Sequence, residues 1–126
     1  MKNSAEIRRN IELVEEAYEF MLAYAAQGRA DEGAGPDGAH IRTFLTQFSE
    51  ATDNIINYLD ELSGLYGTTD TFIKAALTDA NTVKSVMAIM LQKENVSSEM
   101  VDNANGLITV RSYLTALFFI DKAVLN

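Results

Sequence analysis

The sequence contains no cysteine and no tryptophan, and only one proline and one histidine among its 126 residues. Without thiols, the chain can form neither a disulfide nor a cysteine-ligated metal site. A single imidazole excludes the paired histidines of di-iron bundles and histidine-rich zinc sites. No credible Ser-His-Asp or Glu-rich metal constellation remains for catalysis. The sequence therefore predicts a protein that is not an enzyme and that uses no cofactor and no metal.

Basic residues are also few, with 10 Lys and Arg against 18 Asp and Glu and a formal charge of -8. Phosphate backbones and anionic lipids need clustered Lys and Arg, so we expect neither nucleic acid nor a membrane as a partner. The longest apolar run without charge, Ser112 to Ile120, is about half of the roughly 20 residues that span a bilayer. The first residues lack the apolar segment of a signal peptide, and we expect a cytoplasmic protein.

No stretch shows a sustained strand alternation, whereas four long stretches repeat apolar residues at helical spacing. They run from about Ser4 to Gln27, Gly38 to Leu65, Thr69 or Asp70 to Asn95, and Ser97 or Ser98 to the C-terminus. The second and third connections are short, which makes the helices they join antiparallel neighbours. The sequence predicts one all-α domain over residues 1–126, an up-down-up-down four-helix bundle. A break in the third helix is an alternative near Thr78, where a second cap signal occurs.

The first connection is different, because residues 28–38 hold four of the seven glycines and the only proline. We expect an exposed, mobile loop there. Three of its glycines match G-x-G-x-x-G, but a helix rather than a strand precedes them. The three acids of the segment would also repel a phosphate, so the match does not indicate nucleotide binding.

The acids concentrate in the first half of the chain, where residues 1–63 carry 12 acids against five bases. Glu12, Glu16 and Glu19 follow one another at helical spacing and share a face. Such a stripe is either a solvated helix face or a surface for a basic protein, and these three residues are candidate partner-binding residues.

The last predicted helix loses its polar stripe. Along the track through Ser112, Ala116 and Phe119 the residues change from polar to apolar, and the run to Ile120 is apolar nearly all round. A bundle helix that faces water keeps a polar stripe. Either other parts of the bundle cover this face, or a second molecule does. We predict a partner contact through Phe119, Ile120, Ala116 and Ser112, most simply in a homodimer.

Arg111 lies on the track of Ala104, Leu107, Leu114 and Phe118, which is otherwise apolar. A buried guanidinium is costly unless it is paired. We therefore predict that Arg111 forms a buried ion pair with a carboxylate of another helix or reaches water beyond its stem, and a contact with a ligand inside the bundle is a further alternative.

The leading functional hypothesis is protein-protein binding, as an adaptor, assembly chaperone, regulator or inhibitor. The alternative is a small-molecule binder whose internal apolar pocket is lined by Met21, Met87, Met90 and tyrosines and gated by the glycine-rich loop. A weaker alternative is phosphotransfer by His40, as in histidine-phosphotransfer bundles. Those bundles resemble this chain in size, but their His lies in mid-helix before a Lys-Gly pair, whereas Ile41 and Arg42 follow His40.

Overall fold

The computed structural model describes residues 4–33, 40–64 and 70–125, and all regular secondary structure in these ranges is helical. The five helices are α1 (Ser4–Ala26), α2 (His40–Leu62), α3 (Asp70–Leu91), α4 (Ser98–Asn105) and α5 (Ile108–Ala123). The all-α prediction is confirmed.

The alternative break in the third helix is wrong, because α3 is continuous and the Thr78 hydroxyl donates to the Lys74 carbonyl at 3.0 Å instead of capping a new helix.

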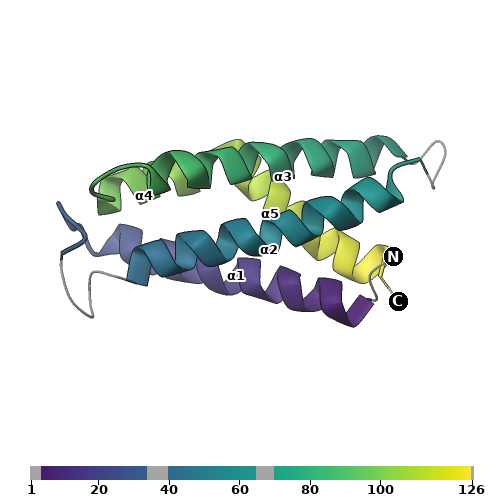
Figure 1. Cartoon of the computed structure of the whole chain (residues 1–126), viewed down its shortest axis with the longest axis horizontal. Helices are drawn as coiled ribbons and strands as arrows, with labels where there is room; N and C mark the ends of the chain where they lie inside the picture. Colours follow the sequence, from purple (N-terminus) through teal and green to yellow (C-terminus); the bar gives the residue numbers. More distant parts are fainter. Residues whose placement is uncertain (1–3, 34–39, 65–69, 126) are drawn as a thin grey trace.

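The long helices run in alternating directions along one axis, and α4 and α5 together return along the remaining edge (Figure 1). Helix α2 packs against both α1 and α3. The returning edge divides its contacts, because α4 packs mainly against α1 whereas α5 packs mainly against α3. The surface along α3 and α5 is therefore a separate face from the one along α1 and α4.

The predicted fourth helix is two helices, so the simple four-helix bundle is not confirmed. Helix α4 ends at Asn105, and Leu107 adopts an extended backbone before α5 begins. Asn and Gly are poor helix formers, and Gly106 closes α4 by donating its N–H to the Asp102 carbonyl at 3.1 Å. The Asn105 side-chain amide donates to the Met21 carbonyl at 3.2 Å, which fixes the end of α4 on α1. Because of this break, the residues of α5 that turn inward differ from those expected for one continuous helix.

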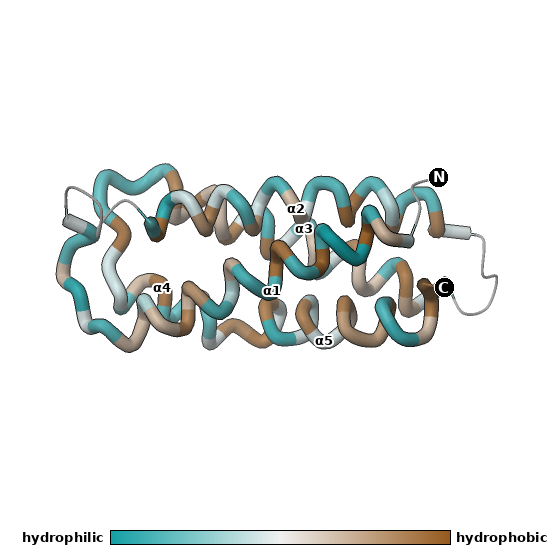
Figure 2. The backbone as a smooth tube through the Cα atoms, turned by 90° about the horizontal axis from the view of Figure 1, so that it is seen from below, coloured by the Kyte–Doolittle hydropathy of each residue, from teal (hydrophilic) through white to brown (hydrophobic). Residues whose placement is uncertain are grey.

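The core is formed by the apolar faces of all five helices. Its largest fully buried side chains include Tyr24, Tyr113, Phe48, Met21, Met87 and Ile120. A buried polar contact joins α5 to α2, where the Tyr113 hydroxyl donates to the Thr52 hydroxyl oxygen at 2.9 Å. Burial raises the pKa of Tyr113, although the hydrogen bond to Thr52 opposes this shift. Figure 2 shows that apolar residues recur along α5.

None of the helices in the described ranges combines the length and the apolar character that crossing a bilayer demands.

Candidate protein-binding surface

An open apolar groove lies between α3 and α5, and we call it the α3/α5 groove. It consists of two adjoining depressions that share Phe72, Ala75 and Phe119. The α3 wall is formed by Thr71, Phe72, Ile73, Ala75, Ala76 and Asp79. The α5 wall and the segment after it contribute Ile108, Arg111, Ser112, Thr115, Ala116, Phe119, Ala123 and Val124.

Two aromatic rings meet in the middle of the groove. The ring of Phe119 approaches that of Phe72 in an edge-to-face arrangement, with centroids 5.2 Å apart. Phe119 nevertheless remains 55% exposed, and Ile108 at the other end of the α5 wall is 79% exposed. Each large apolar side chain left in water forgoes roughly 1.5 to 3 kcal/mol of burial free energy. A contiguous apolar surface of this kind marks an interaction site more often than isolated exposed residues do.

The floor of the groove between these large side chains is made of short ones. Ala75, Ala76 and Ala116 form its apolar part, and Ser112 and Thr115 add hydroxyl groups. Asp79 and Arg111 bring one charge of each sign to the same depression. The Asp79 carboxylate accepts a hydrogen bond from the Thr109 hydroxyl at 3.3 Å, which ties α3 to the start of α5.

Three of the four residues predicted on the last helix line this groove. Phe119 and Ser112 are exposed, and Ala116 lines the floor with only 9% of its surface accessible. The prediction that Ile120 faces a partner is wrong, because Ile120 is 1% exposed and belongs to the core. One residue along a helix turns the side chain by about 100°, and this step carries Ile120 from the outer face to the inner one.

Arg111 does not form the buried ion pair that was predicted first, and its exposed side chain corresponds to the alternative in which the guanidinium reaches water. Arg111 is exposed and lines the groove, and it makes no ion pair with any residue in the described ranges. The expectation assumed one helix from Ala104 to Phe118. Because the chain breaks at Gly106 and Leu107, the inward face of α4 does not continue onto the Arg111 face of α5.

The predicted acidic stripe lies on α1, away from the residues that line the groove. Glu12, Glu16 and Glu19 are all exposed. Glu12 pairs with Arg9 at 3.3 Å, and Glu16 accepts a hydrogen bond from the Gln47 amide at 3.3 Å. Within the residues that the structure describes, no three acids or histidines gather as a metal site would require. The stripe therefore shows the geometry of a solvated helix face.

Sequence reasoning missed one acid next to this stripe. Desolvation raises the pKa of Glu15, with further contributions from the negative charges of Asp121, Glu12 and Glu19. Asp121 itself accepts a hydrogen bond from the Arg8 guanidinium at 2.7 Å, which connects α5 to α1. Glu15 lies near the Arg8–Asp121 pair because α5 packs beside α1. The spacing of residues within α1 does not reveal this packing.

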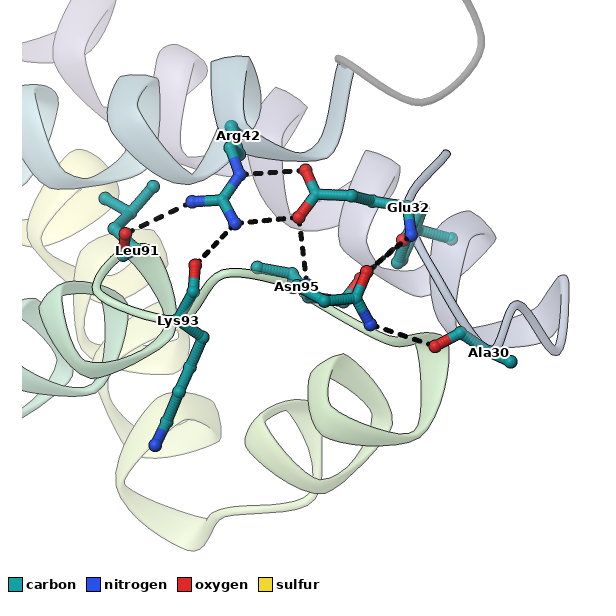
Figure 3. A network of polar contacts seen from close by, with 8 residues as sticks. Ala30, Glu32, Arg42, Leu91, Lys93 and Asn95 are labelled. Atoms are coloured by element: carbon teal, nitrogen blue, oxygen red, sulfur yellow. Dashed lines mark hydrogen bonds and ion pairs between the residues drawn. The ribbon is translucent and has the colours of Figure 1, made fainter. Parts of the chain in front are cut away.

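A second feature that the sequence did not indicate is a polar network at one end of the molecule (Figure 3). Arg42 and Glu32 form two hydrogen bonds, from Nε to Oε2 at 2.8 Å and from Nη2 to Oε1 at 2.7 Å. Arg42 also donates to the carbonyls of Leu91 at 3.1 Å and Lys93 at 2.6 Å, and thus satisfies the C-terminal end of α3. The hydrogen bond from Arg42 lowers the pKa of Glu32, supported by a bond from the Val96 N–H at 3.0 Å.

The same network holds part of the predicted mobile loop. The Glu32 N–H donates to Asn95 Oδ1 at 2.8 Å, and the Asn95 amide donates to the Ala30 carbonyl at 2.9 Å. Ser98 exchanges two further bonds with the backbone of Arg29, at 3.0 and 2.8 Å. Residues 29–32 are thus attached to the turn between α3 and α4, while residues 34–38 of the predicted loop lie outside the described residues. The hydrogen bonds of this network join one element of the fold to another, and we therefore interpret the network as structural.

The alternative functional residues occupy ordinary structural positions. Met21, Met87 and Met90 are at most 3% exposed and pack within the core. Four hollows between described residues are open surface grooves, and these methionines line none of the four. His40 is exposed at the first position of α2, where its ring and that of Phe20 lie in a T-shaped arrangement with centroids 6.3 Å apart. The geometry offers no particular support for the internal pocket, and phosphotransfer by His40 stays a prediction.

No family model, no curated protein and no solved structure matches the chain.

Proposed function

We propose that the protein acts by binding another protein, as an adaptor, assembly chaperone, regulator or inhibitor, and that the α3/α5 groove is the surface that it uses. The observation that carries this proposal is the position of Phe119, a 55% exposed aromatic side chain shared by two adjoining apolar depressions. Aromatic side chains at the centre of an apolar surface commonly contribute much of the binding free energy in protein complexes.

The shape of the groove favours a helical ligand. Two helices with short side chains between them form a trough into which the ridge of a third helix can pack. Here Ala75 and Ala116 keep the trough open from opposite sides, and Phe72 and Phe119 cross its middle. An amphipathic helix would bury its apolar face in this trough, as in other helix-in-groove complexes.

The acidic stripe on α1 offers weaker support as a binding surface. Its carboxylates are exposed, and two of them already contact Arg9 and Gln47. The hollow between α1 and α2 is bordered by several polar side chains, including Asn10, Gln47 and Asn54. Binding there would gain little from apolar burial, so a basic protein on this face is the second choice.

Photo-crosslinking from inside the groove tests the proposal. A photoreactive phenylalanine analogue at position 119 should form adducts with protein when the full chain is irradiated in its native cell. The matched control places the same analogue at position 57, where Asn57 is exposed on α2. A second substitution in the trough, Ala75→Arg, should reduce the adducts from position 119. The proposal is overturned by adducts of equal yield from positions 119 and 57, or by no protein adduct from position 119.

A further inference from the structure

We infer that the occupant of the α3/α5 groove is a second copy of this chain, with the two α5 helices packed antiparallel about a twofold axis. The inference rests on the proposed function, because it names the partner of the same groove. Two properties of the groove carry it: the charge of the helices that form it, and the order of large and small side chains along α5.

The charge distribution favours this face over the face of α1 and α2 for contact between two copies. Helices α1 and α2 carry nine acids against three bases. Helices α3 and α5 carry three acids against four bases. The protein as a whole has a formal charge of -8, so two copies that met through α1 and α2 would bring their excess negative charge together. Contact through α3 and α5 avoids this repulsion, and the groove itself holds one charge of each sign in Asp79 and Arg111.

The side chains along the groove face of α5 are arranged so that the face complements itself. Within the depression that Arg111 and Ser112 line, large apolar side chains stand at the two ends of the α5 wall, Ile108 and Phe119, and both are exposed. The residues between them on this face are Arg111, Ser112, Thr115 and Ala116, of which three are small. In an isologous contact, the same surface must supply both the projecting side chains and the space that receives them. The groove face of α5 meets this condition.

Antiparallel pairing centred between Ser112 and Thr115 matches the two faces residue by residue. Ile108 of one copy then faces Phe119 of the second copy, and Ser112 faces Thr115 of the second copy. Arg111 faces Ala116 of the second copy, so the two guanidinium groups do not oppose each other. The short side chains at the centre allow the helix backbones to approach closely, while Phe119 reaches toward the α3 wall of the second copy.

The contact that this pairing forms along α5 is short. From Ile108 to Phe119 the helix rises roughly 16 Å at 1.5 Å per residue. Such a contact lies toward the lower end of the sizes found in stable complexes. We therefore expect a reversible dimer with a dissociation constant on the order of micromolar.

Sedimentation of the full chain with matched charge variants tests the dimer. The wild type should sediment as a dimer at tens of micromolar, and Phe119→Glu should weaken association by at least about tenfold. Asn57→Glu adds the same charge on exposed α2 and should leave association unchanged. Circular dichroism verifies that both variants are folded, which we expect because both side chains are exposed. A wild type that stays monomeric throughout this range, or a Phe119→Glu variant that associates as the wild type does, overturns the inference.

Disulfide trapping tests the antiparallel register, and the absence of native cysteine makes it direct. A mixture of Ser112→Cys and Thr115→Cys chains should form the mixed disulfide several times faster than either chain pairs with an Asn57→Cys chain. Equal rates in all mixtures would overturn the register.

Photo-crosslinking of the purified protein separates this inference from the proposed function. Adducts from position 119 with twice the mass of the chain support self-association. If the purified chain gives no such adduct while position 119 still captures a different protein in the cell, the dimer is wrong and the binding function stands. If position 119 gives no protein adduct in either setting, both are wrong.

Discussion

Glu32 and Arg42 hold each other by two charge-assisted hydrogen bonds of 2.8 and 2.7 Å, and this one pair connects three parts of the fold. Glu32 belongs to the connection after α1, Arg42 lies in the first turn of α2, and the same guanidinium reaches the carbonyls at the end of α3. Bidentate Arg-carboxylate pairs are stronger than exposed single contacts. The pair keeps the first connection close to the turn between α3 and α4.

Arg42→Ala should therefore lower the free energy of unfolding by about 2 to 3 kcal/mol, because it leaves Glu32 and two backbone carbonyls without their shared donor. Urea unfolding followed by circular dichroism measures this change. Arg9→Ala removes the exposed pair with Glu12 and serves as the control, with an expected change within about 0.5 kcal/mol. Equal effects of the two substitutions would contradict this role for Arg42.

The same pair should make stability sensitive to acid. The folded pKa of Glu32 lies below its ordinary value, so its contribution to stability is fully present above about pH 4.3, the unfolded pKa. That contribution is lost as the pH falls through the lower folded pKa. The difference in unfolding free energy between wild type and Glu32→Gln should be constant near neutral pH and should shrink in acid. Urea titrations at a series of pH values measure it, and a difference that grows on acidification would refute the prediction.

This difference isolates Glu32 from the other shifted carboxyls. The hydrogen bond from the Gly64 N–H, with help from Lys74, lowers the pKa of Asp70, so Asp70 also loses its contribution in acid. Glu15 has a raised pKa and acts in the opposite direction, since its burial is more favourable when it is protonated. Both groups are common to the wild type and Glu32→Gln, so their effects cancel in the comparison.

Arg111→Ala should leave the stability of the isolated fold within about 0.5 kcal/mol of the wild type, because the side chain is exposed and pairs with no acid in the described ranges. The prediction concerns the monomer, so it is measured by urea unfolding in a Phe119→Glu background with and without Arg111→Ala. A loss of several kcal/mol would mean that Arg111 has a structural partner after all.

Two glycines should respond to alanine in opposite directions. Gly28 has a φ of 65°, a left-handed conformation that costs other residues about 1 to 2 kcal/mol. Gly106 has a φ of -78°, and an added Cβ would meet its nearest atoms only at 3.5 Å, an ordinary contact. We expect Gly28→Ala to destabilise by that amount, and Gly106→Ala to stabilise by roughly 0.4 to 1 kcal/mol through a less flexible unfolded chain. Thermal and urea unfolding measure both, and a destabilising Gly106→Ala would show that the break after α4 requires glycine itself.

Local chemistry in the sequence was sufficient to predict much of the helical structure. The spacing of Ile7, Ile11 and Val14 in α1 indicates an inward face, and these three side chains are indeed buried. The loss of a polar stripe toward Phe119 predicted an apolar face on the last helix, and Phe119 is 55% exposed there. These features depend on residues within a few turns of one another.

Only the tertiary structure decided which way each part of that last helix faces. Asn105 and Gly106 interrupt it, and the contact of Asn105 with the Met21 carbonyl directs α4 onto α1 while α5 turns to α3. That change of direction moved Arg111 out of the core and Ile120 into it, and it created the α3/α5 groove. The pairing of Glu32 with Arg42 likewise joins residues that no periodicity relates. Such contacts form between segments far apart in the chain, and their energies depend on packing geometry that no local pattern records.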